Sequence, residues 1–218
     1  MTLLKSLANE TISFMTNEQD FYFTVTSAYR ASELKVKGSR FIADIFPAAS
    51  KEDVEKHLAE IRKEFYDATH HCYAFRLGIG AENIRAADDG EPAGTAGKPI
   101  LQALVSKELT DCLLIVTRYY GGVNLGTGGL SRAYSEAAQI ATEGAAIQKI
   151  FITESFTLTL DYEDISSVER MLHSYEAKHS SEFAEKVIMK IEIRKSLAGK
   201  FRDELAEKYY GKVIISEG

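Results

Sequence analysis

The sequence predicts an α+β protein with two domains, and three observations support this class. Residues 113–116 (LLIV) form a short apolar run typical of a buried strand. A glycine-rich segment and a pattern of apolar residues at helical spacing follow this strand directly. After residue 144, strand and helix patterns alternate in the order β-α-β-β-α-β. The change of pattern places a domain boundary between residues 145 and 152.

The first elements follow from local patterns. Residues 1–20 show only weak helical spacing, and we assign them to an N-terminal extension. Alternating apolar residues predict strands at 21–26 and 41–45. Ser50 is suited to cap the helix that follows, because its hydroxyl can accept a hydrogen bond from a first-turn N–H group. Glu52 and Asp53 then lie where the helix dipole favours carboxylates.

Residues 70–77 alternate as a strand, with His71 on one face and with His70 and Cys72 on the other. Two adjacent histidines suggest a metal site. However, no H-x-x-x-H spacing or cysteine cluster accompanies them, so we favour a histidine bonded to backbone or to a carboxylate. We therefore predict no metal.

The next segment, residues 88–99 (DDGEPAGTAGKP), combines carboxylates with glycines and prolines. This composition predicts a loop of fixed shape, and Pro99 suits the first turn of a following helix. Asp88, Asp89 and Glu91 could hold a hard cation or act as acid and base. The alternative is Asp-Gly turn chemistry and helix capping. With His71, these three residues are the catalytic candidates.

The strand at 113–116 is followed by a cation, Arg118, and by two aromatic residues, Tyr119 and Tyr120. Five glycines then occur within the nine positions 121–129. A helix beginning near Gly129 would direct the N–H groups of residues 127–130 outward, where a phosphate could bind. The spacing matches neither a P-loop nor a dinucleotide-binding loop. Alternatively, the glycines only permit a tight turn and close packing. The candidate anion-binding or RNA-binding residues are Arg118, Tyr119, Tyr120, Gly121, Gly122, Gly126, Thr127, Gly128, Gly129, Arg132 and Lys98.

The C-terminal pattern predicts a ferredoxin-like β-α-β-β-α-β domain over residues 151–218, which leaves 21–148 for the first domain. Strands are expected at 156–160, 176–184, 187–194 and 213–215, and helices at 165–172 and 197–205. The residues of this second domain carry no evident chemistry.

Composition restricts the function further. The formal charge is −6, with 16 basic and 19 acidic residues in positions 1–150 and 10 and 13 in the remainder. Strong non-specific nucleic-acid binding through bulk charge is therefore not expected, and such binding would need a local patch. Cys72 and Cys112 show no metal-ligand or disulfide spacing, and no apolar run reaches membrane-spanning length. We expect a cytoplasmic monomer without cofactor or membrane contact.

Three blocks of this sequence resemble the signature blocks of the IMPACT family: DATHHCYAF (67–75), DDGEPAGTAGKPIL (88–101) and RYYGGVNLGTGGLSRAY (118–134). The resemblance covers about residues 35–145, and the C-terminal region is similar to the extra domain of the bacterial, YigZ-like branch. It implies a ribosomal-protein-like N-terminal domain of the left-handed β-α-β kind, also found in elongation factor G. It also implies a C-terminal domain similar to the last domain of that factor.

The resemblance implies a function in translation, since eukaryotic relatives are translational regulators that bind the activator of a starvation-responsive initiation-factor kinase. The first hypothesis is a binding or regulatory module that contacts RNA, the ribosome or a translation-associated protein partner through the glycine-rich loop. The alternative is a small-molecule, phosphate-handling enzyme, which would use the same loop with His71, Asp88, Asp89 and Glu91. The lack of a recognisable nucleotide-base pocket places it second. In either case we expect the three blocks to converge on one cleft.

Overall fold

The computed structural model describes residues 20–79, 83–210 and 212–217. The chain divides into two compact units, one covering Tyr22–Ile150 and the other containing Phe21 and the residues from Phe151 onward. Phe21, which the sequence analysis assigned to the first domain, is grouped with the second unit. The α+β class with two domains is confirmed. The proposed extension at residues 1–20 lies outside the described residues, apart from Asp20.

The first unit contains a six-stranded sheet with the order β2-β4-β7-β5-β6, in which β3 pairs with β4. All of its strand pairs are antiparallel. The strands are β2 (Tyr29–Arg30), β3 (Leu34–Val36), β4 (Ser39–Pro47), β5 (His70–Leu77), β6 (Asn83–Ala87) and β7 (Cys112–Tyr119). A separate two-stranded sheet joins β1 (Phe21–Val25) to β8 (Ile147–Phe151).

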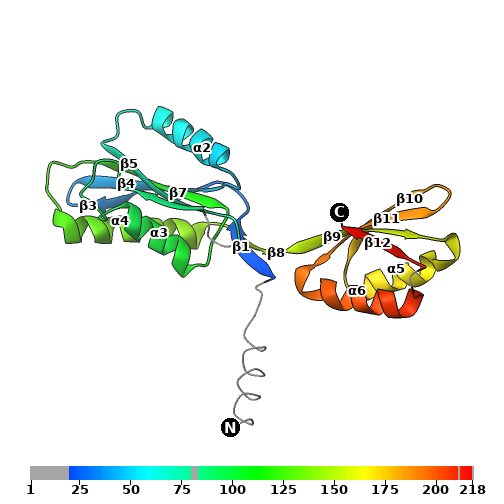
Figure 1. Ribbon diagram of the computed structural model, residues 1–218. Coiled ribbons are helices and arrows are strands. Elements are labelled where there is room, and N and C mark those ends of the chain that lie inside the picture. Colours follow the sequence, from blue (N-terminus) through cyan, green and yellow to red (C-terminus); the bar gives the residue numbers. More distant parts are fainter. Residues whose placement is uncertain (1–19, 80–82, 211, 218) are drawn as a thin grey trace, which may run out of the picture. The chain divides into compact units, whose positions relative to one another are not determined.

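Three helices cover the six-stranded sheet in two layers (Figure 1). Helix α2 (Lys51–Glu64) lies on one face, and α3 (Gly97–Ser106) and α4 (Gly126–Gly144) lie on the other. The predicted cap of α2 is confirmed, since Ser50 accepts from the Asp53 N–H group. Asp53 in turn accepts from the Ser50 N–H group, which completes a capping box.

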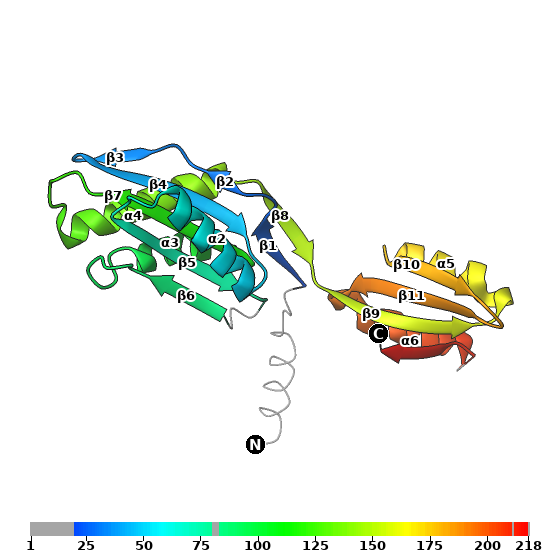
Figure 2. The same ribbon diagram turned by 90° about the horizontal axis from the view of Figure 1, so that it is seen from above.

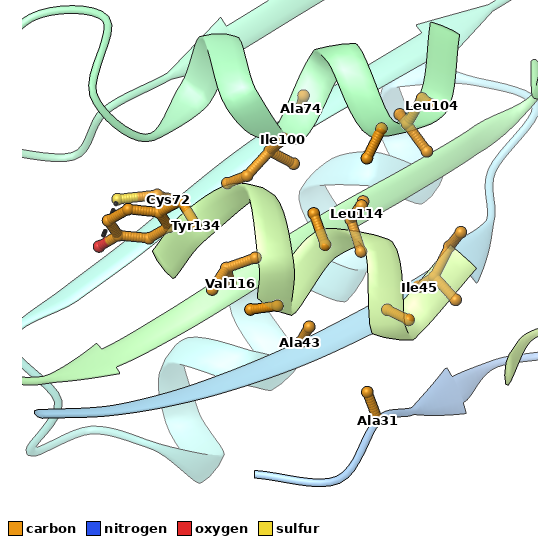
Figure 3. Close-up of a cluster of buried hydrophobic side chains, with 14 of the residues drawn as sticks. Ala31, Ala43, Ile45, Cys72, Ala74, Ile100, Leu104, Leu114, Val116 and Tyr134 are labelled. Carbon is orange, nitrogen blue, oxygen red and sulfur yellow. Dashed lines mark hydrogen bonds between the residues drawn. The ribbon is translucent and has the colours of Figure 1, made fainter. Parts of the chain in front are cut away.

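The central strand β7 explains the continuous apolar run at its start. Leu114 and Val116 face α3 and α4, while Leu113 and Ile115 face α2, so this strand is buried on both sides. Figure 3 shows the first of these cores, in which side chains from the sheet meet Ile100 of α3 and Tyr134 of α4. No helix in the described ranges is both long and apolar enough to cross a membrane.

The structure differs from the sequence prediction in the start of one helix and in four strands. Helix α4 begins at Gly126, almost a full turn before the expected start near Gly129, so three of the five glycines lie in its first turn. Strands β2, β3, β6 and β8 were not predicted. They have only two to five residues and are mostly exposed or half-buried, so they lack the apolar alternation that marks a strand in sequence.

The second unit has the predicted ferredoxin-like fold. Its antiparallel sheet has the order β10-β11-β9-β12, and both helices contribute to one apolar core with one face of the sheet (Figure 2). The elements are β9 (Thr153–Leu160), η1 (Tyr162–Asp164), α5 (Ile165–Ser174), β10 (Lys178–Phe183), β11 (Val187–Arg194), α6 (Lys195–Tyr209) and β12 (Ile214–Glu217).

Candidate functional site

The three sequence blocks meet at one end of the sheet of the first unit. Strands β5 and β7 are neighbours, and His70 lies opposite Arg118 in their register. The loop that follows β6 passes over the same end of the sheet. The carbonyl oxygen of Asp89 lies 2.7 Å from His70 Nδ1, and the Asp89 carboxylate accepts from the His71 N–H group at 2.7 Å. The blocks are therefore joined by direct contacts within one unit.

Arg118 is the centre of a buried polar network at this position. Its side chain is 5% exposed, and its guanidinium donates to Glu91 Oε1 at 2.6 Å and to Ser39 Oγ at 3.2 Å. The Tyr134 hydroxyl donates to the same Glu91 oxygen at 2.8 Å. Glu91 thus receives two hydrogen bonds in a site closed to solvent, where an unpaired carboxylate would be costly.

This geometry corrects the expectation that Arg118 faces an external anion. Strand β7 continues past residue 116, so Arg118 stays in phase with Leu114 and Val116 and points toward α3 and α4. The guanidinium therefore pairs with Glu91 inside the unit. The three blocks meet through these buried contacts rather than around an open cleft lined by Arg118.

Tyr134 is a second member of the network, and the sequence pattern treated it only as part of an apolar helical stripe. Its ring is fully buried and packs edge-on against Phe41, with centroids 5.1 Å apart. The Cys72 sulfur lies 3.3 Å from its hydroxyl oxygen (Figure 3). Burial raises the pKa of the Cys72 thiol to about 12 and also raises that of Tyr134, so both groups are neutral donors. A tyrosine within a stripe of alanines was the available signal, since a buried hydroxyl needs a partner.

Asp88 holds the loop that carries Glu91. Its carboxylate accepts from the N–H groups of Gly94, Ala96 and Gly97 at 2.8 to 3.0 Å. Although burial acts to raise the pKa of Asp88, these three hydrogen bonds lower it below its ordinary value. The turn-and-capping interpretation therefore describes Asp88, because its bonds shape the loop and begin α3.

The other two catalytic candidates, Asp89 and His71, differ in how they are bonded: Asp89 has partners, whereas the buried His71 Nε2 atom has no hydrogen-bond partner among the described residues. Asp89 has φ +45° and bonds the His71 backbone, with a longer contact of 3.4 Å from Arg62. His71 is 8% exposed, and burial lowers the pKa of its imidazole. Over the described residues, no group of three or more His, Cys, Asp or Glu side chains is placed to hold a metal ion. Catalysis by these residues stays a hypothesis.

The glycine-rich segment has two parts with different roles. Gly121 packs directly on the turn before β4, since a Cβ added to it would lie 1.9 Å from the carbonyl carbon of Gly38. The Gly121 N–H group donates a hydrogen bond to Ser39 Oγ, which also accepts one from the Arg118 guanidinium. At Gly122 an added Cβ would meet open space, but φ is +80°. The close-packing interpretation therefore holds for Gly121, while Gly122 permits the turn.

The second part is the exposed first turn of α4. Its N-cap, Leu125, provides no side-chain cap, and Asn124 accepts only from the Gly126 N–H group at 2.9 Å. The remaining first-turn N–H groups have no partner within the helix. Arg132 Nη1 lies 3.6 Å from the position of a Cβ added to Gly128, so its guanidinium lies against this turn. Arg132, not Arg118, is the cation beside the helix N-terminus.

The remaining anion-binding candidates are Tyr119, Tyr120 and Lys98. Tyr120 is 51% exposed, and its ring centroid lies 5.5 Å from the Arg118 guanidinium. The Tyr119 hydroxyl donates to Asp67, and Arg40 lies over its ring. Lys98 is exposed in the first turn of α3, a different helix. Anion binding by any of these residues stays a prediction.

Comparisons with known proteins agree with this description. The Impact N-terminal domain matches residues 37–142, and a domain of unknown function, DUF1949, matches residues 158–212. An IMPACT family member of Haemophilus influenzae is 36% identical over 186 residues, which cover 84% of this chain and 90% of that protein. The IMPACT family member YigZ of Escherichia coli is 32% identical over 83% of this chain and 90% of its own.

A solved structure shows the same architecture. The crystal structure of a hypothetical protein superimposes with a TM-score of 0.65 at 28% identity, covering 92% of this chain and 98% of the other. With the two domain matches and the identity over nearly the whole length of both relatives, the chain belongs to the IMPACT family.

Proposed function

We propose that this protein is a binding module that contacts the phosphate backbone of RNA, free or within the ribosome, through the first turn of α4. The observation that carries the proposal is the Arg132 guanidinium lying against an exposed helix N-terminus that has no side-chain cap. Helix N-termini bind anions because unpaired N–H groups and the positive end of the dipole point at the ligand. Arg132 adds a charged donor to the same turn.

The glycines make this turn accessible to a large anion. Gly126 and Gly128 have no side chain that could cover the backbone, and both are exposed, as is Thr127 between them. A Cβ added to Gly126 would meet no atom within 4 Å, so the space outside the turn is open. A phosphate on a polymer could therefore reach the N–H groups directly, as it does at other glycine-rich helix starts.

The surroundings of the turn favour RNA over free phosphate. Tyr120 and Val123, which precede the helix, are 51% and 48% exposed. An exposed tyrosine ring offers a stacking face for an unpaired base, at about 1–3 kcal/mol per base. Phosphate contact at Arg132 and base stacking at Tyr120 together suit a single-stranded segment or loop of RNA.

The buried network has a supporting role in this proposal. Arg118 and the Gly121 N–H group share Ser39 Oγ, so the network fixes the beginning of the glycine segment. Arg118 is then a positioning residue that holds the loop, and Glu91 holds Arg118.

The alternative, a phosphate-handling enzyme, would need a free acid, base or metal ligand near the turn. Asp88, Asp89 and Glu91 instead accept hydrogen bonds from backbone N–H groups or from Arg118. The fourth candidate, His71, has no hydrogen-bond partner for its Nε2 atom among the described residues, but it is buried. A melting-temperature screen with nucleotides and phosphorylated metabolites distinguishes the two functions, because a specific ligand stabilises the folded state.

The direct test is the affinity of the full-length protein for a fluorescent single-stranded RNA, measured by anisotropy at several salt concentrations. Arg132→Ala should weaken binding about tenfold and reduce the salt slope by about 0.7, the value for one lost phosphate contact on a single strand. The matched control is Arg85→Ala, which removes another exposed arginine from the same unit. This control should lower the affinity less than about twofold, because Arg85 lies on the α2 face of the sheet, opposite α4.

Equal affinity of Arg132→Ala and the unaltered protein would overturn the proposal, as would an equal loss with Arg85→Ala. Stabilisation by a nucleotide without any RNA affinity would favour the enzyme function instead.

A further inference from the structure

The two faces of the sheet in the first unit are covered unequally. Helices α3 and α4 share one face, while α2 lies alone on the other (Figure 1). A helix is about 10 Å across and strands are spaced about 4.8 Å apart, so one helix covers roughly two strands. Helix α2 therefore leaves a groove along each side. The groove toward β6 has a volume of about 410 Å³.

The floor of this groove is apolar. Val54 and Leu58 line it from α2, and Tyr73 and Phe75 line it from β5. The two aromatic rings are inclined by only 9°, with centroids 6.5 Å apart. Ile84 of β6, which is 42% exposed, extends the apolar surface to the open side. The floor suits an apolar group.

The rim of the same groove is basic. Lys51, Arg62 and Arg85 line it together with a single acidic residue, Glu55, among the described lining residues. Arg62 has only the 3.4 Å contact with Asp89, and within the described ranges Lys51 and Arg85 form no ion pair. We call this feature, from Lys51 and Arg62 across to Arg85, the basic groove. Among the described lining residues three cations face one carboxylate, and this excess of positive charge is the part of the site that selects a ligand.

The groove on the other side of α2 provides an internal comparison. Asp44, Glu60 and Glu64 line it, and the Arg30 guanidinium lies between Asp44 and Glu64 with both contacts at 2.5 Å. The ring of Phe65 lies beneath the same guanidinium, 4.7 Å from its centre. The chain thus supplies its own cation to the acidic groove, whereas the described residues supply the basic groove with fewer carboxylates than cations.

We infer that the basic groove binds a small amphipathic anion, with an apolar body on the Tyr73–Phe75 floor and a carboxylate, sulfonate or phosphate at the basic rim. The volume lies at the lower end of the range for small-molecule pockets, which excludes large cofactors. The site lies on the sheet face opposite α4 and shares no residue with the proposed RNA contact. The inference can therefore be tested independently of that proposal.

The test uses 1-anilinonaphthalene-8-sulfonate, a planar aromatic sulfonate, with the full-length protein. Its fluorescence titration should saturate at one site, and the amide NMR signals of Ile84 and Arg85 should shift. Arg85→Ala should weaken binding about tenfold, because one charge-assisted contact is lost, while Arg85→Lys should keep most of the affinity. Inorganic sulfate alone should bind at least tenfold more weakly, since it makes no use of the apolar floor.

Two variants serve as matched controls. Lys63 is exposed on α2 next to Arg62 but does not line the groove, so Lys63→Ala should leave the affinity within twofold. Arg132→Ala, which tests the RNA contact, should also leave it unchanged. Unaltered affinity in Arg85→Ala, an equal loss in Lys63→Ala, or equally tight binding of sulfate would each overturn the inference. Circular dichroism melting of each variant separates lost affinity from lost folding.

Discussion

The two units of this chain differ in what their cores contain. In the described residues, every buried polar or charged side chain outside the tyrosines and cysteines lies in the first unit: Ser39, Asp44, His71, Glu91, Thr95, Thr110, Thr117, Arg118 and Thr142. The core of the ferredoxin-like unit is formed by aliphatic and aromatic residues, with Met171 and Met189. Both cores are closed to water, but within the described ranges a buried ion pair is found only in the first.

This difference separates a unit stabilised by packing from one that also holds a specific polar arrangement. A buried ion pair is weak evidence for stability, since apolar residues of similar volume often do as well or better. Arg118 and Glu91 are therefore better explained by what they position, which is the glycine segment before α4. The second unit needs no such explanation, because apolar burial alone accounts for its core.

The largest effect should come from separating the units. Residues 1–150 and 151–218, expressed as two fragments, should each melt cooperatively, because each contains its own buried core. Calorimetry and circular dichroism would measure this. A fragment 151–218 that stays unfolded would break the comparison, since its apolar core would then depend on the first unit.

Breaking the ion pair should come next in size. Glu91→Ala or Arg118→Ala should lower the free energy of unfolding by about 3–5 kcal/mol, because each leaves its partner charged and buried. Leu158→Ala in the second unit should cost a similar 2–5 kcal/mol through a cavity.

The double variant Glu91→Leu with Arg118→Met separates these two causes. It should recover most of the stability while losing RNA affinity, because the charges are gone but the positioning of the loop is gone too. Denaturant unfolding measures the first quantity and anisotropy the second. A double variant as unstable as the single ones would show that the network is required for packing.

A smaller effect should distinguish the two neighbouring glycines. Gly121→Ala should destabilise the protein by about 1–3 kcal/mol or more, because the added Cβ overlaps the backbone of Gly38. Gly122→Ala should cost about 1 kcal/mol, from its left-handed backbone alone. Equal costs at the two positions would contradict the close approach at Gly121.

A comparably small effect, which disappears in acid, concerns Asp88. Its folded-state pKa is lowered, so its charge stabilises the fold above the unfolded value of about 3.9, and this stability is lost as the pH falls through the folded value. Asp88→Asn should therefore cost about 1–2 kcal/mol at pH 7 and converge with the unaltered protein in acid. Urea unfolding at several pH values measures the difference.

The matched control for this prediction is the same substitution at Asp203, which is exposed on α6 of the second unit. It should change the free energy of unfolding by less than about 0.5 kcal/mol at pH 7. A cost at Asp88 that is independent of pH would show that the side chain acts through shape and not through charge.

Local patterns in the sequence determined most of the architecture. The alternation at 70–77, the capping serine at residue 50 and the β-α-β-β-α-β order of the second unit were all confirmed. Each depends on interactions within one turn or one strand, or on the period with which a chain buries one face. Such signals are readable without knowing which segments become neighbours.

The role of the signature residues was decided only by the tertiary structure. Arg118 could not be assigned to an external anion or to Glu91 from the sequence, because the choice depends on how far β7 continues and which loop passes over its end. Position 121 requires a glycine because a side chain there would overlap the backbone of Gly38, which comes much earlier in the chain. These contacts join distant segments through sheet pairing, and their energies depend on burial that no local pattern records.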